Sequence, residues 1–137
     1  MARIRGDKAH AARLRRLTSP AAVKEISQAL FIAGSQIEAD WATSITNGAI
    51  SGKGHIASLP GEPPNADTHV YDRSIQTVLT APLHVQVYSD DPKAKMLEFG
   101  TSKMAARPAA APAAAKNHGH ATETVRDAVN RVVRRAG

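Results

Sequence analysis

Histidines and carboxylates are the only side chains in this sequence with the chemistry of strong metal ligands, because the chain contains no cysteine. The six histidines are His10, His55, His69, His84, His118 and His120. Only His118 and His120 lie close together in sequence; they could hold a metal if a carboxylate joined them, but no other ligand pair has a recognisable spacing. We therefore predict no metal site, and we place these two histidines in a solvated linker.

No other residue pattern indicates catalysis. No serine has the glycine-bounded setting of a hydrolase nucleophile, and no histidine pair has the spacing of a zinc protease. Gly52-Lys53-Gly54 lacks the spacing of a phosphate-binding loop, and Asp90-Asp91 precede a proline, where turn residues are common. The sequence therefore predicts a protein that has no catalytic residues, needs no cofactor and is not an enzyme.

The positive charge of the chain is concentrated at its two ends. Of the formal net charge of +6, residues 1–17 contribute +5 and residues 116–137 contribute +3, which leaves −2 for the middle. Such ends can bind nucleic acid, meet acidic protein neighbours, or simply keep a particle component in solution. No aromatic residue lies among the basic ones, so a base-stacking platform is not expected. The arginines of the N-terminal basic arm are Arg3, Arg5, Arg13, Arg15 and Arg16.

Apolar residues at intervals of three and four predict a long helix in the first half of the chain. Ser19-Pro20 is a typical helix start, and the stripe continues to Ile45, so the helix should end near Thr46. Trp41 lies on this stripe and is expected in the core. Residues 7–17 can form a shorter, polar helix, which is either an arm ordered against a neighbour or a solvated tail.

The second half of the chain is expected to hold a hairpin and two more helices. Alternating residues predict two antiparallel strands over residues 74–79 and 83–88, with Pro82 at the turn, and a short helix follows over 93–99. Prolines in residues 105–115 predict a semi-extended connector, and the helical period returns from Thr122.

Length and composition favour a single domain with tails. We divide the chain into a basic N-terminal arm (1–18), a central domain (19–115) with a long surface loop at 48–67, and a C-terminal basic helix (116–137). A loop of this length usually binds something or becomes ordered on assembly. The sequence contains no run of apolar residues long enough to span a bilayer and no signal peptide, so we expect a soluble protein that stays where it is made.

Three segments, taken in order, resemble one protein family. The first is the proline-rich stretch over residues 58–68, and the second is Ser74-Ile75 followed by the strand over residues 85–89. The third is Glu98-Phe99-Gly100-Thr101, followed by Arg107-Pro108. Over roughly residues 20–115 this order and spacing are similar to the head–tail joining family of tailed phages, the neck or tail-completion proteins of lambda-like siphophages.

This resemblance implies an α+β fold, with a long N-terminal helix packed on a small antiparallel β-sheet and, here, a C-terminal helix. It also implies a structural virion protein, made in the bacterial host cytoplasm, that forms a homo-oligomeric ring of six or twelve copies at the head–tail junction. Its partners would be portal or connector proteins and tail-tube or tail-terminator proteins, with packaged DNA passing through the ring. The alternative function is a small basic nucleic-acid-binding protein that uses the N-terminal arm.

The residues singled out by the resemblance have two interpretations. They either form the interface between subunits or order the loop of their own subunit, and the sequence does not distinguish the two. Members of the family usually have a large residue directly after the Arg-Pro pair, where this chain has Ala109. The residues concerned are Glu98, Phe99, Gly100, Thr101, Arg107 and Pro108.

Overall fold

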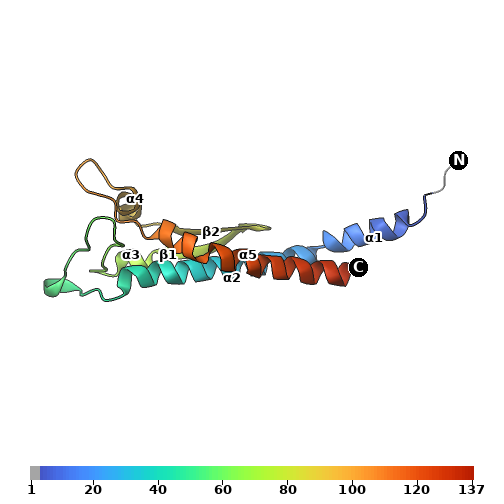
Figure 1. Cartoon of the computed structure of the whole chain (residues 1–137), viewed down its shortest axis with the longest axis horizontal. Helices are drawn as coiled ribbons and strands as arrows, with labels where there is room; N and C mark the ends of the chain where they lie inside the picture. Colours follow the sequence, from blue (N-terminus) through green and yellow to red (C-terminus); the bar gives the residue numbers. More distant parts are fainter. Residues whose placement is uncertain (1–3) are drawn as a thin grey trace.

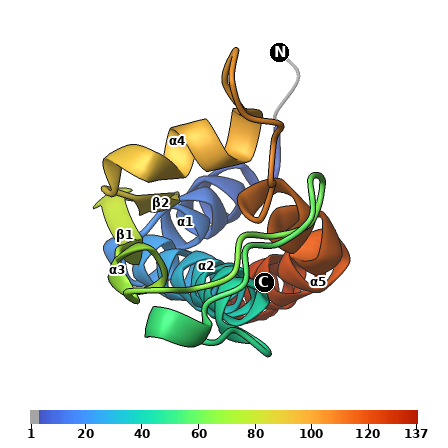
Figure 2. The ribbon, with the colours of Figure 1, turned by 90° about the vertical axis from the view of Figure 1, so that its left-hand side faces the viewer.

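The computed structural model describes residues 4–137 as an elongated body in which two long helices lie side by side, with a β-hairpin along one of them (Figures 1 and 2). This arrangement confirms the predicted α+β class, with a two-stranded antiparallel sheet and a C-terminal helix. The elements in chain order are α1 (Asp7–Leu17), α2 (Pro20–Thr46), the 3-10 turn η1 (Gly52–Gly54), α3 (Val70–Arg73), β1 (Ile75–Ala81), β2 (His84–Ser89), α4 (Pro92–Phe99) and α5 (Ala110–Ala136).

Helix α2 begins and ends where its sequence predicts. The Ser19 hydroxyl accepts a hydrogen bond from the Ala22 amide at 3.2 Å, and Pro20 occupies the first helical position. Helix α5, also 27 residues long, packs along α2. The buried positions of both helices are rich in alanine, and such small side chains allow two helix axes to approach closely. The pair therefore forms the long axis of the molecule.

The hairpin packs on α2 through a glycine. A Cβ atom at Gly34 would lie 2.9 Å from Thr77 and 3.0 Å from Val85, so only glycine lets the strands come this close. At the tip of the hairpin, Leu83 has a left-handed φ of 60°, and its amide donates to the Ser27 hydroxyl at 3.0 Å. Pro82 lies in the turn as predicted, and β1 extends two residues further than expected, to Ala81. Helix α2 thus holds the hairpin at its middle and at its tip.

The main core lies at the end of the molecule that carries α3, α4 and the start of α5. Trp41 is buried there, as predicted, with its ring edge-to-face with Tyr71 at a centroid distance of 6.2 Å. The Trp41 indole N–H donates to the Tyr71 hydroxyl at 3.1 Å, which satisfies both polar groups inside an apolar cluster. This core joins α2 to the segments that follow the long loop.

The segment preceding the C-terminal helix corrects two predictions. Residues 105–115 are not a semi-extended connector, because α5 already begins at Ala110. Pro112 lies in the first turn of α5, where its missing N–H removes no intrahelical hydrogen bond. The solvated linker predicted for His118 and His120 is also wrong, since both residues are exposed side chains within the helix.

Candidate functional site

Glu98 connects two helices that are separated by a loop. Helix α4 begins at Pro92 after the Asp91 carboxylate, which accepts from the Lys93 amide at 2.9 Å, and Glu98 lies in its last turn. The Glu98 carboxylate accepts the backbone N–H groups of the first residues of α5, at 2.8 Å from Ala109, 3.0 Å from Ala110 and 2.8 Å from Ala111. These are groups that a helix cannot satisfy itself, and they lie at the positive end of its dipole. Glu98 therefore caps α5 from outside.

Gly100 makes possible the tight turn that follows α4. Its φ of 73° lies in the left-handed region, and a Cβ there would lie 2.8 Å from the Ala106 amide nitrogen. The following loop closes on itself, because the Thr101 amide donates to the Met104 carbonyl at 2.8 Å. The loop thus returns the chain to the side of α4, so that Ala106 lies against Gly100.

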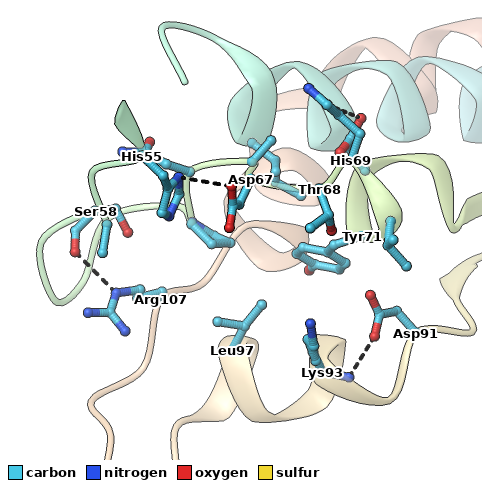
Figure 3. Close-up of a pocket in the computed structure, with 17 residues that line it drawn as sticks. His55, Ser58, Asp67, Thr68, His69, Tyr71, Asp91, Lys93, Leu97 and Arg107 are labelled. Carbon is cyan, nitrogen blue, oxygen red and sulfur yellow. Dashed lines mark hydrogen bonds and ion pairs between the residues drawn. The ribbon is translucent and has the colours of Figure 1, made fainter. Parts of the chain in front are cut away.

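Arg107 joins this loop to the long proline-rich loop. Its amide donates to the Leu97 carbonyl at 2.6 Å, and its side-chain Nε donates to the Ser58 carbonyl at 3.2 Å (Figure 3). Pro108 is half-buried, and Ala109 is 1% exposed, so a large residue after the Arg-Pro pair would have no space here. Two of the three resembling segments are therefore in direct contact.

The residues named from the resemblance divide into two groups in the structure. Glu98, Gly100, Thr101 and Arg107 all make contacts within the same chain, as the loop-ordering interpretation expects. Phe99 differs, because 76% of its surface is exposed. It is the most exposed of the five aromatic residues in the chain.

A cavity of about 210 Å³ lies between the long loop, α3 and α4 (Figure 3). Tyr71 lies on its wall, and burial raises the pKa of the Tyr71 hydroxyl; the Trp41 hydrogen bond lowers it, and the negative charges of Glu98 and Asp91 raise it further. The residues that the structure describes contain no cluster of three histidine or carboxylate side chains able to hold a metal ion.

Beside the cavity, three residues form a hydrogen-bonded series that the sequence did not reveal. Ser51 Oγ lies 3.2 Å from His69 Nε2, and His69 Nδ1 lies 3.3 Å from Asp72 Oδ2, an order of groups that resembles a hydrolase triad. Acyl transfer also requires free N–H donors for the developing oxyanion. The amide of Gly52, the residue after Ser51, already donates to Asp67 at 2.9 Å. We therefore interpret the series as a brace that fixes the loop.

An apolar groove lies between the tip of the hairpin and the first half of α2. Its volume is about 930 Å³, and its lining is mostly apolar but also includes Ser27, Lys24 and Gln28. Phe31 and Ile32 in the groove are 42% and 54% exposed, and Leu79 faces them from β1. The sequence carried a signal for this groove, because Phe31 and Ile32 are apolar but lie outside the stripe that runs from Val23 to Ile45.

Three of the five arginines of the predicted basic arm lie in helix α1. Arg3 lies outside the described residues, and Arg5 precedes the helix. Arg13 and Arg15 are exposed, and Arg16 donates to the Ala136 carbonyl at 2.7 and 3.0 Å. The arm is therefore attached to the C-terminal end of α5.

Comparison with protein-family models, with curated proteins and with solved structures gives no match for this chain. Over residues 4–137, none of the helices has the length and apolar character needed to cross a membrane. Inferences about function therefore depend on the geometry of the surface and on the sequence motifs.

Proposed function

We propose that this chain is a structural subunit of a tailed-phage particle that forms a ring at the head–tail junction and joins the portal complex to the tail. The ordered motifs support the choice of particle, and the surface of the subunit supports self-assembly. The observation that carries the proposal is that the subunit exposes an apolar projection, Phe99, and an apolar groove, which are far apart on the same chain.

The projection and the groove cannot meet within one subunit. Phe99 is the last residue of α4, which follows the base of the hairpin (Figure 1). The groove lies at the hairpin tip, where Leu79 and Pro82 line it. The seven residues of β1 separate base from tip by about 20 Å, at about 3.3 Å per residue. Burial of both surfaces therefore requires another chain, and in this proposal that chain is a second copy, with Phe99 of one copy in the groove of the next.

A contact between two different surfaces of identical subunits is heterologous. Such contacts generate a closed ring when the rotation from one copy to the next closes, and a filament when it does not. The tight internal bonding of Glu98 and Arg107 suits this role, because it holds Phe99 in a fixed position before assembly. The proposal includes a ring of six or twelve copies, a location in the virion and the absence of enzymatic activity.

Single cysteines test the contact cleanly, because the natural chain has none. Phe99→Cys and Ile32→Cys variants are prepared separately, mixed, and treated with a short bis-maleimide reagent. Cross-linked dimers should form in the mixture and not in either variant alone, since the contact joins unlike surfaces. Dimers formed equally well by Phe99→Cys alone would contradict the heterologous arrangement.

A matched control uses Lys53, an exposed residue of η1 that follows the C-terminal end of α2, whereas the groove lies on the first half of that helix. Lys53→Cys mixed with Phe99→Cys should give no cross-linked product. Native mass measurement of the natural chain, alone and with portal or tail-tube proteins, then tests the ring itself. A protein that stays monomeric with every such partner would overturn the proposed function.

A further inference from the structure

The fold brings the two basic ends of the chain together at one end of the molecule. Helix α1 and the end of α5 lie at the same end of the long axis (Figure 1). They are in contact there, because the Arg16 guanidinium donates to the Ala136 carbonyl at 2.7 and 3.0 Å. Two segments about 120 positions apart in sequence thus form one surface.

This basic end carries more positive charge than the whole chain. Residues 4–17 have five basic residues against Asp7, and residues 126–137 have four arginines against Asp127, which gives +7. Residues 18–125 together carry −2. The molecule is therefore strongly polarised along its length, and the opposite end, with α4 and the long loop, is close to neutral.

Most of the charges at this end are available to a ligand. Glu25 forms ion pairs with Arg131 and Arg135, and these are the only ion pairs at the basic end among residues 4–137. Apart from Arg16, six basic side chains there are exposed and have no acidic partner within the described part of the chain. They are Arg5, Lys8, Arg13, Arg15, Arg126 and Arg134.

We propose that the basic end, formed by α1 and the last turns of α5, is a sequence-independent binding site for the phosphate backbone of double-stranded DNA. Helix α1 is 11 residues long, or about 16 Å at 1.5 Å per residue. Duplex DNA presents about one phosphate charge per 1.7 Å of axis, so this length faces roughly nine charges. Guanidinium groups, which dominate this surface, bind phosphate oxygens in pairs.

The composition of the surface favours DNA over an acidic protein partner. Protein interfaces are usually depleted of charge at their centre and anchored by aromatic side chains. Helix α1 instead consists largely of alanine and basic residues, and its most exposed apolar side chain is the half-exposed Leu14. Without an aromatic residue to stack on bases, contacts to the backbone are the ones this surface can make. Binding of DNA at this site is separate from ring formation, because a single chain carries the whole site.

The test measures binding of a fluorescent 20-base-pair duplex to the full chain by anisotropy, over a range of salt concentrations. The variant Lys8→Gln/Arg15→Gln/Arg134→Gln removes three charges from both helices of the site and avoids Arg16, whose hydrogen bonds hold α1 in place. Glutamine keeps the helix propensity close to that of lysine and arginine. Affinity at 100 mM salt should fall at least about tenfold, and the salt slope should become shallower by about three.

The matched control removes three charges from the opposite end of the molecule, with Lys93→Gln/Lys95→Gln/Lys103→Gln. Both triple variants change the net charge from +6 to +3, so they differ only in position. The control should retain affinity within about twofold, and circular dichroism should show equal helix content in both variants. Equal loss of affinity in the two variants would overturn the site, as would no binding by the natural chain at 50 mM salt.

A polyglutamate competitor separates DNA from an acidic protein as the ligand. At equal total charge, unlabelled duplex should displace the labelled duplex at a much lower concentration than polyglutamate does. Equal displacement by polyglutamate would overturn the assignment to DNA. Because the assay uses single subunits and does not require a ring, its failure would leave the proposed function standing.

Discussion

Replacing Glu98 with alanine should destabilise the subunit far more than an ordinary surface substitution, because one carboxylate satisfies three backbone N–H groups. The variant would leave the amides of Ala109, Ala110 and Ala111 without this acceptor at the start of α5. Ala109 is fully buried, so water cannot easily replace the lost oxygen there. The N-terminal turn of α5 and the core beneath it should loosen together.

The size of the effect follows from three overlapping contributions. Loss of a helix N-cap costs about 1–2 kcal/mol, and loss of a negative charge near a helix N-terminus costs about 0.3–1 kcal/mol. A buried N–H group left unpaired costs about 1–3 kcal/mol. Because these contributions share the same hydrogen bonds, we expect a total of about 2–4 kcal/mol. At about 4 °C per kcal/mol for a chain of this size, the melting temperature should fall by roughly 8–16 °C.

Circular dichroism during urea and thermal unfolding measures this loss. Glu98→Gln keeps one carbonyl acceptor and loses the charge, so it should lie between the natural chain and Glu98→Ala. Glu123→Gln removes an exposed carboxylate from the middle of α5 and should change the free energy of unfolding by less than about 0.5 kcal/mol. If Glu98→Ala were as stable as Glu123→Gln, the interpretation of Glu98 as the cap of α5 would be wrong.

Three further outcomes are expected. Gly100→Ala should lower the free energy of unfolding by at least about 1 kcal/mol more than Gly61→Ala does. Both glycines have positive φ, but only a Cβ at Gly100 would meet backbone atoms within 4 Å. Equal losses of stability in the two variants would mean that the close approach at Gly100 is unimportant. In a Tyr88→Phe variant, ultraviolet titration should show Tyr71 ionising at higher pH in the folded than in the urea-unfolded chain, because burial raises its pKa. A folded pKa above the unfolded one means that this contribution to stability is complete below the unfolded pKa and is lost as pH rises through the folded pKa; coincident titrations would contradict this. Ser51→Ala should hydrolyse p-nitrophenyl acetate at the same rate as the natural chain, since the Gly52 amide is occupied by Asp67; a clear fall in rate would revive the hydrolase interpretation.

Local features of this fold were predictable because they depend on neighbouring residues. Ser19-Pro20 marks the start of α2. Asp91-Pro92 marks the start of α4, and Gly100 marks its end. The hairpin followed from its alternation and from Pro82, although Leu83 in a left-handed conformation was not expected. Its amide is held by Ser27, which is 56 positions away in sequence, so no local pattern could reveal it.

The start of α5 could not be predicted for the same reason. Judged from neighbouring residues alone, the prolines in residues 105–115 predict a break in the helix, because most helix positions reject proline. In the structure Pro112 lies where the helix needs no N–H, and the three amides around the start are satisfied by Glu98 from another helix. Packing against α2 then stabilises the rest, including a hydrogen bond from Asn117 to Asp40 at 2.6 Å. Tertiary contacts therefore overrode local propensity.

Adjacent residues of one motif thus have opposite roles. Glu98 and Gly100 are committed to their own subunit, whereas Phe99 between them is exposed and held rigidly on both sides. The fold of the subunit does not require an aromatic residue at this position, since nothing within the described chain covers most of its surface. An exposed phenylalanine here fits the proposed contact with another chain, and the bonds of Glu98 and Gly100 would fix its position before such a contact formed.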